Sequence, residues 1–246
     1  MLRAAAAAVV LGVLSQDGGR STVMVSAAAS LTDVLQQVSA AYEQKYGDPV
    51  ILNFAASNVL ARQIAAGASV DVFVSADEAQ MDRVSALIEP SSRVALLSNR
   101  LAIAVPDDRP RAFSSARDLV DPAIRRIAIG DPAAVPAGVY AKTYFEKLGI
   151  WDALAPRLVP SGSVRLALAA VESGAVEAAV VFKTDSASAR RTREAFVVPA
   201  GEGPRIVYPA ALMRAAPNRE GARRFLDYLR GPAAMAVFER AGFLRP

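Results

Sequence analysis

Apolar runs of strand length alternate along this chain with longer stretches of amphipathic character. The first unit pairs the apolar run 22–26 with residues 31–46, where apolar side chains recur on one face of a helix. Further strand-and-helix units of this kind follow at 50–54 with 59–66 and at 70–74 with 77–87. Alternating strands and helices predict mostly parallel sheets covered by helices, so we expect an α/β fold.

The second half of the chain repeats this pattern. It contains predicted strands at 101–105, 126–129 and 178–182, and predicted helices at 138–148, 164–173, 218–229 and 232–241. This order fits two lobes, with crossovers near 98–100 and 206–209, better than two domains in series. We expect lobe I to comprise residues 21–99 and 208–246, and lobe II residues 100–207.

Composition narrows the chemistry that the chain can perform. Its 246 residues, 53% of them hydrophobic, are enough for a sizeable core. It has no Cys, which excludes disulfides and thiolate chemistry, and no His, which removes the commonest general base. The formal charge of +4 comes from scattered arginines, so we expect no nucleic-acid partner.

The N-terminus resembles an export signal. Arg3 precedes the apolar run 4–14, which is too short to span a bilayer and has the length of a signal core. We therefore expect a signal peptide in residues 1–20 and a periplasmic protein. Because no clear small-x-small cleavage site follows Leu14, a cytosolic N-terminus is the alternative.

Small residues fill the turns that lead into the predicted helices. Residues 27–31 (Ala-Ala-Ala-Ser-Leu) and 54–58 (Phe-Ala-Ala-Ser-Asn) each place a serine at a helix start. The first N–H groups of a helix lack internal partners and the helix dipole is positive there, so a compact oxyanion can bind. The alternative is ordinary capping, in which Ser30 caps its helix with Asp33 at the capping-box position.

Two further helix starts lie in the second half. Residues 130–138 contain two prolines and end in Gly138, which leaves the backbone approachable, and residues 161–165 read Ser-Gly-Ser-Val-Arg. Each by itself also fits a rigid loop or a routine cap. Together, four helix starts could converge on one cleft. Such a site of N–H and hydroxyl donors suits sulfate, molybdate or tungstate better than hydrogen phosphate, whose proton needs an acceptor.

Several segments carry a resemblance to a known family. They are residues 27–32, 57–64, 72–77, 130–132, 135–141 and 164–165. In these segments the chain resembles the ModA family, the periplasmic molybdate-binding proteins of ABC importers. The resemblance implies a type II periplasmic binding protein fold with two lobes, each a mostly parallel sheet flanked by helices, and a ligand cleft between them. We expect a monomer that needs no cofactor.

The resemblance also implies a set of ligand-binding residues. Ser30 and Ser57 would contribute hydroxyl and backbone N–H groups, and Ala137 and Val164 would contribute backbone N–H groups. These donors hold the oxygens of the oxyanion, so no residue is expected to ligate the metal directly. The family's tyrosine donor falls at Phe182, which cannot donate, so binding is expected to be weaker or less selective than with tyrosine.

The function implied by the resemblance is binding of molybdate or tungstate and its delivery to a membrane permease. A binding protein for another solute, such as sulfate or a carboxylate, is the first alternative. An enzyme is disfavoured because the sequence has neither a G-x-S-x-G elbow nor a histidine base. A sensing domain of a transcription regulator is disfavoured because no helix-turn-helix segment precedes Thr22.

Overall fold

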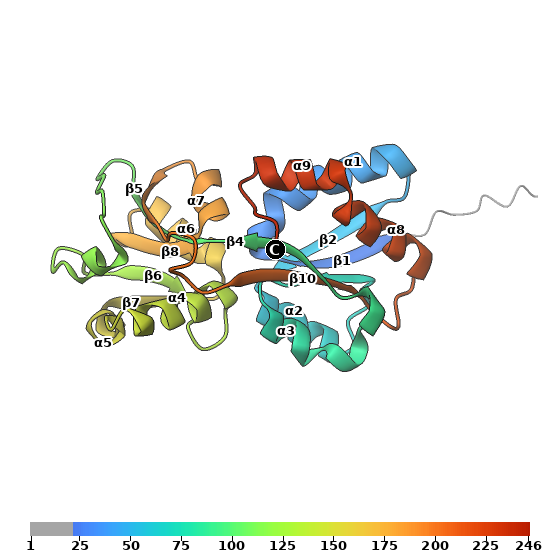
Figure 1. Ribbon diagram of the computed structural model, residues 1–246, viewed down its shortest axis with the longest axis horizontal. Coiled ribbons are helices and arrows are strands. Elements are labelled where there is room, and N and C mark those ends of the chain that lie inside the picture. The colour runs from blue at the N-terminus through green and yellow to red at the C-terminus, as the bar shows by residue number, and fades with distance from the viewer. Residues whose placement is uncertain (1–21) are drawn as a thin grey trace, which may run out of the picture.

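The computed structural model describes residues 22–246, and the signal peptide expected at 1–20 lies outside these residues. Two five-stranded sheets lie side by side, each with helices on both faces (Figure 1). The strand order is β2-β1-β3-β10-β4 in the first sheet and β7-β6-β8-β5-β9 in the second. The predicted α/β architecture with two lobes is therefore confirmed.

The first sheet is built from both ends of the described chain. Its strands are β1 (Val23–Ala28), β2 (Val50–Ala55), β3 (Val72–Val74), β4 (Val94–Asn99) and β10 (Ile206–Leu212). Its helices are α1 (Thr32–Tyr46), α2 (Ser57–Ala65), α3 (Glu78–Arg83), α8 (Arg219–Arg230) and α9 (Pro232–Arg240). Short 3-10 turns are η1 (Ala29–Leu31), η2 (Ser85–Leu87) and η3 (Pro90–Ser92). Helices α1, α8 and α9 cover one face of the sheet, and α2 and α3 cover the other (Figure 1).

The second sheet uses the middle of the chain. Its strands are β5 (Leu101–Pro106), β6 (Ile127–Gly130), β7 (Leu158–Ser161), β8 (Ala178–Phe182) and β9 (Thr192–Val197). Its helices are α4 (Pro136–Lys147), α5 (Trp151–Leu154), α6 (Val164–Glu172) and α7 (Lys183–Ser188), with 3-10 turns η4 (Ala116–Val120) and η5 (Ala155–Arg157). Helices α6 and α7 cover one face, and α4 and α5 lie toward the other (Figure 1).

Both sheets are mixed rather than mostly parallel. In the first, β1 runs parallel to β2 and β3, whereas β10 runs antiparallel to β3 and β4. In the second, β6 runs parallel to β7 and β8, whereas β5 runs antiparallel to β8 and β9. The antiparallel pairs involve the strands that carry the chain between the sheets, and a helical crossover is not needed to join such strands.

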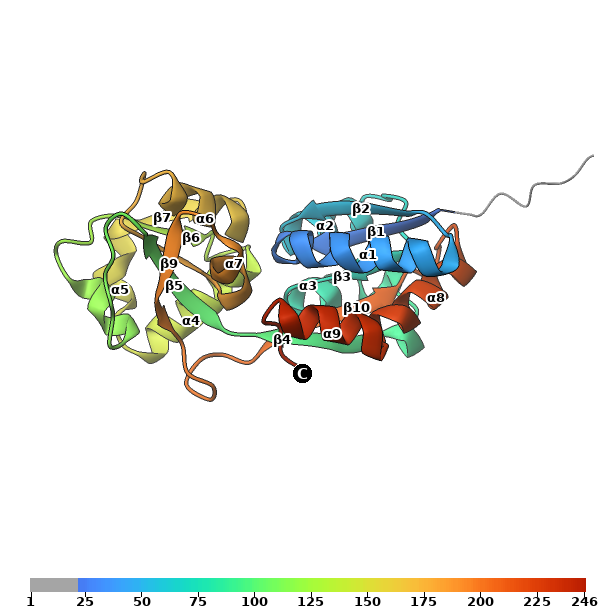
Figure 2. The same ribbon diagram turned by 90° about the horizontal axis from the view of Figure 1, so that it is seen from above.

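Two chain segments link the halves (Figure 2). Arg100 separates β4 from β5, and residues 198–205 lead from β9 to β10. Residues 206 and 207 fall within the predicted range of lobe II, but they pair with β4 in the first sheet. The C-terminal segment adds a bridge beside this point, because Ser98 and Leu244 exchange backbone hydrogen bonds of 2.7 and 3.0 Å. Within residues 22–246, no helix is both long and apolar enough to cross a membrane.

Candidate functional site

The starts of η1, α2, α4 and α6 meet at one small cavity between the two sheets. Two of these elements belong to each half of the molecule. All five residues predicted for the site line this cavity, namely Ser30, Ser57, Ala137, Val164 and Phe182. The cavity holds about 10 Å³, which is close to the room that one water needs. The arrangement therefore favours a compact ligand.

Ser30 lies in η1 and does not cap α1. The N-cap of α1 is Leu31, and no side chain caps this helix. The Ser30 Oγ instead lies 3.1 Å from the hydroxyl oxygen of Tyr208. The predicted capping box with Asp33 is wrong because the 3-10 turn moves the start of the α-helix past Ser30. The Ser30 hydroxyl, which is buried at the cavity, is thereby released from a capping role.

Ser57 is the first residue of α2, and Ala56 is its N-cap. The Ser57 Oγ accepts a hydrogen bond of 2.9 Å from the backbone N–H of Ala76, which follows β3. A hydroxyl that accepts such a bond still has its own hydrogen to donate. Since Ser57 and Ala76 both line the cavity, this hydrogen is available to a ligand there.

The second half contributes backbone donors. Ala137 is the second residue of α4, after Pro136, and Val164 is the first residue of α6. N–H groups at these positions have no partner within their own helix. The Ser163 side chain caps α6 by accepting from the N–H of Leu166 at 3.2 Å, which leaves the Val164 N–H for a ligand.

Gly138 has a packing role in this turn. A Cβ added to Gly138 would stand 1.9 Å from the carbonyl oxygen of Gly130, at the end of β6. Glycine therefore lets the start of α4 pack against β6. The sequence predicted that Gly138 leaves the backbone approachable. The group that approaches it is the neighbouring strand β6, whereas Ala137 lines the cavity.

Phe182 ends β8 and presents an aromatic ring to the cavity. Its ring centroid lies 5.7 Å from that of Tyr208 and 6.4 Å from that of Tyr140. The side chain is buried, and a phenyl ring has no hydrogen to donate. This part of the cavity wall is thus apolar.

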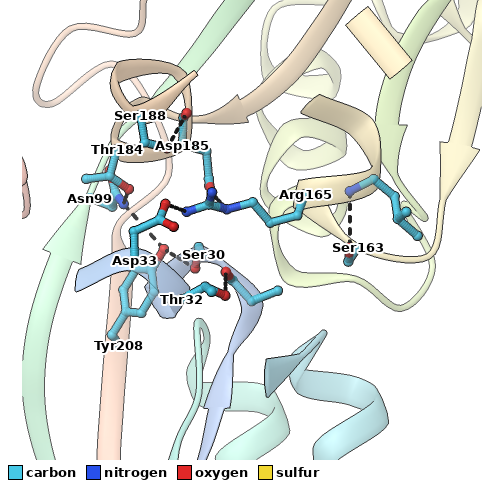
Figure 3. Close-up of polar contacts among 12 residues, drawn as sticks. Ser30, Thr32, Asp33, Asn99, Ser163, Arg165, Thr184, Asp185, Ser188 and Tyr208 are labelled. Atoms are coloured by element: carbon cyan, nitrogen blue, oxygen red, sulfur yellow. Dashed lines mark hydrogen bonds and ion pairs between the residues drawn. The ribbon is translucent and has the colours of Figure 1, made fainter. Parts of the chain in front are cut away.

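An ion-pair cluster joins the two halves beside the cavity (Figure 3). The guanidinium of Arg165, the residue after Val164, contacts the carboxylates of Asp33 in α1 and Asp185 in α7, each at 2.7 Å. Burial raises the pKa of Asp185 to about 6, although Arg165 acts to lower it. The two carboxylates compensate the positive charge of this guanidinium. The groups that can bind an anion in the cavity are therefore N–H and hydroxyl dipoles.

Comparison with known proteins identifies the family of this fold and site. The model of the bacterial extracellular solute-binding protein family matches residues 23–244. The molybdate-binding protein ModA of Escherichia coli is 36% identical over 242 residues, which cover 95% of this chain and 92% of that protein. ModA of Haemophilus influenzae is 36% identical and covers 90% of this chain and 89% of its own length. The chain belongs to the ModA family.

Solved structures of this type share the fold. The periplasmic molybdate-binding protein of Azotobacter vinelandii superposes with a TM-score of 0.82 at 24% identity, over 91% of this chain and 99% of that one. The sulfate-binding protein SubI of Mycobacterium tuberculosis superposes with a TM-score of 0.79 at 16% identity, over 91% and 86%. The fold of this chain is therefore shared with a protein that is named for binding a different oxyanion.

Some residues near the ModA-type cavity were not predicted. Asp185 and Tyr208 were not predicted, because no local sequence pattern connects Asp185 with Arg165 or Tyr208 with Ser30. Two signals were nevertheless present. Arg165 stands in the first turn of a helix, where the dipole disfavours a cation, and Tyr208 interrupts the apolar strand β10 with a hydroxyl. Both irregularities call for a polar partner.

Proposed function

We propose that this protein is the substrate-binding component of an ABC importer, which binds molybdate or tungstate between its lobes and delivers it to a membrane permease. The observation that carries the proposal is the convergence of four helix starts and two serine hydroxyls on one buried cavity. The names of the ModA relatives support the choice of molybdate among oxyanions.

The donors in this cavity suit an anion that carries no proton. Molybdate, tungstate and sulfate offer acceptor oxygens in every direction, and N–H and hydroxyl groups can bond to each of them. Hydrogen phosphate brings a hydrogen that needs an acceptor, and a buried polar group left unmatched costs about 1–3 kcal/mol. We therefore expect the site to discriminate against hydrogen phosphate by protonation state.

Size supports the same class of ligand. The cavity has room for a compact group, and apolar side chains, Val135 and Phe182 among them, close its walls. A sugar phosphate or another organic phosphate would have to displace these walls. Sulfate is the second candidate for two reasons. Phe182 provides no phenol donor to the ligand, and the small cavity also suits a smaller ion.

The remaining features of the proposal concern the setting of the protein. We place it in the periplasm, exported by the signal in residues 1–20, because the matched family consists of bacterial extracellular solute-binding proteins. It acts as a monomer, without a cofactor and without catalysis. The resident ligand is the transported oxyanion, held through its oxygens.

Calorimetric titration of the purified protein tests this proposal. Molybdate, tungstate, sulfate and phosphate are titrated separately at neutral pH, with competition where two of them bind. We expect 1:1 binding of molybdate and tungstate and no detectable binding of phosphate. Preference for sulfate would replace the proposed ligand with the second candidate, and silence toward all four anions would refute oxyanion binding.

A further inference from the structure

A row of hydrogen-bonded side chains stands behind Ser30, outside the cavity wall. Asn99 ends β4, Tyr208 lies in β10 and Ser30 lies in η1, and all three are buried. The amide nitrogen of Asn99 lies 3.3 Å from the Tyr208 hydroxyl, which lies 3.1 Å from the Ser30 Oγ (Figure 3). Ser30 lines the cavity, whereas Tyr208 reaches it through Ser30. We call these residues the Asn99–Tyr208–Ser30 triad.

The orientation of Asn99 sets the direction of these hydrogen bonds. Its Oδ1 accepts from the backbone N–H of Arg100 at 2.8 Å, so its NH₂ group faces Thr184 and Tyr208. An amide NH₂ group donates hydrogen bonds and does not accept them. The Tyr208 oxygen is therefore an acceptor toward Asn99. Burial raises the pKa of Tyr208, so the phenol keeps its hydrogen at neutral pH.

The hydrogen of Tyr208 then has one acceptor within reach. In the part of the chain that the structure describes, the Tyr208 hydroxyl has hydrogen-bond contacts with Asn99 and Ser30. Since Asn99 donates, the phenol hydrogen goes to the Ser30 Oγ. The reverse arrangement, in which Ser30 donates to Tyr208, would leave a buried phenol hydrogen without an acceptor, and that is costly.

A Ser30 oxygen that accepts from Tyr208 has its own hydrogen free for the cavity. The second serine is arranged in the same way, because the Ser57 Oγ accepts from the Ala76 N–H. Both serines therefore face the ligand as donors, with their oxygens already engaged. This common arrangement comes from two unrelated parts of the fold, a tyrosine of β10 and a backbone amide after β3.

We infer that Tyr208 is a positioning residue for oxyanion selection, which fixes Ser30 as a donor and so excludes ligands that carry a proton. This inference rests on the proposed function and deepens it. In the absence of the phenol, the Ser30 oxygen regains an acceptor site and can bond to a protonated ligand oxygen. Tyr208 therefore affects the choice between anions as well as the affinity for any one of them.

A double-mutant cycle with sodium molybdate tests the inference. Tyr208→Phe, Ser30→Ala and the double variant are titrated by calorimetry beside the unmodified protein. We expect Tyr208→Phe to weaken molybdate binding by about tenfold, which is no more than the usual contribution of one hydrogen bond to a charged group. The double variant should bind within about twofold of Ser30→Ala, because Tyr208 acts through Ser30. The inference would be overturned if Tyr208→Phe bound molybdate as the unmodified protein does, or if the fold-changes of Tyr208→Phe and Ser30→Ala multiplied in the double variant.

Tyr42→Phe provides the matched control for loss of a buried phenol. Tyr42 is also buried, and its hydroxyl donates to Asp48 at 3.0 Å, away from the cavity-lining residues. It should lower thermal stability without changing molybdate affinity. In Tyr208→Phe phosphate should begin to compete with molybdate for binding, and in Tyr42→Phe it should not. Failure of phosphate to compete in Tyr208→Phe would reduce Tyr208 to a structural role.

Failure of the proposed function would be visible separately. If the unmodified protein binds none of the oxyanions, the proposed function fails, and the triad is judged in the ligand-free protein by proton NMR. We expect a slowly exchanging Tyr208 hydroxyl proton whose chemical shift moves in Ser30→Ala. A rapidly exchanging Tyr208 hydroxyl proton, or a chemical shift that is the same in Ser30→Ala, would overturn the inference independently of any ligand.

Discussion

At the scale of a single residue, Phe182 lines the cavity with an aromatic ring that has no hydrogen to donate. Its ring closes one side of the cavity and packs near Tyr208 and Tyr140. The other predicted site residues offer a hydroxyl or an N–H group, whereas Phe182 offers a face of carbon atoms. A phenol at this position would bring its hydroxyl to the proposed binding cavity, because the last residue of β8 lines that cavity.

Phe182→Tyr should therefore tighten molybdate binding. One added hydrogen bond to a charged ligand predicts an increase in affinity of roughly tenfold. Calorimetric titration measures the change, with Phe113→Tyr as a control that adds a phenol in the second half without lining the cavity. Equal affinity in Phe182→Tyr and the unmodified protein would remove Phe182 from the binding site.

Asp185 predicts a pH-dependent contribution to stability. Its pKa in the folded protein is about 6, against an ordinary value of 3.8, mainly because of burial. A raised pKa favours the protonated carboxyl in the fold, so this stabilisation is complete below about pH 4 and is lost as the pH rises through about 6. Asp185→Asn lacks this titration.

The free energy of unfolding of the unmodified protein, relative to Asp185→Asn, should thus be greater at pH 4 than at pH 7. The expected difference is on the order of 2–3 kcal/mol. Urea unfolding of both proteins at several pH values measures it. Parallel pH profiles would show that Asp185 does not titrate as described.

Residue-level prediction located residues that lie at helix starts, although their role toward a ligand stays a prediction. Ser57, Ala137 and Val164 were predicted to line one site, and the structure brings them together. It failed for Ser30 as a cap, because the short turn η1 could not be distinguished from the start of α1 by composition. The partner of Ser30, Tyr208, lies 178 positions away along the chain, and no local pattern reports such a contact.

The start of helix α6 shows how an element supplies a donor without a polar side chain. Val164 is the first helical residue, and its cap, Ser163, has the extended backbone with φ of −158° and ψ of 165°. The N–H of a first helical residue is not used by the helix, and proline is well tolerated there. The residue before a proline also prefers an extended backbone.

Val164→Pro should accordingly remove the ligand's donor and spare the helix. We expect molybdate affinity to fall by roughly tenfold or more, the effect of losing a hydrogen bond to a charged group. Val164→Ala is the matched control, because it shortens the side chain but keeps the N–H. If the two variants bind molybdate equally well, the Val164 N–H is not a ligand donor.

Burial alone did not decide which elements could be predicted. Strand β8 was predicted with its observed bounds because all of its residues are buried and apolar. Strand β10 is also buried throughout, yet the sequence predicted only a crossover near 206–209, and the partly exposed edge strands β4, β7 and β9 were not predicted as strands. Since β10, β4 and β9 take part in antiparallel pairs, their absence from the prediction explains why the sheets were expected to be mostly parallel.

At the scale of the whole molecule, the two halves are connected by chain crossovers and by one ion-pair cluster at the cavity. The Asp33 carboxylate belongs to the first half, and Arg165 and Asp185 belong to the second. Two-lobed binding proteins commonly hinge about their crossovers when a ligand binds. A contact between the halves beside the cavity therefore favours the arrangement in which the donors converge.

Asp33→Asn should weaken molybdate binding modestly while leaving the free energy of unfolding nearly unchanged. The pair between Asp33 and Arg165 is partly exposed, and such pairs contribute up to about 1 kcal/mol, or roughly fivefold in affinity. Asp82→Asn is the control, because its ion pair with Arg93 lies within the first half. Equal effects of the two variants on binding would contradict a role for Asp33 in holding the halves together.

Locating the ligand is the most direct test of oxyanion binding between the halves. Crystals of the protein with molybdate, measured at the molybdenum absorption edge, would give the position of the metal from its anomalous signal. We predict one peak in the cavity, with ligand oxygens within hydrogen-bond distance of the Ser30 and Ser57 hydroxyls and the Ala137 and Val164 N–H groups. A peak elsewhere, or a ligand in the cavity held by other groups, would contradict it.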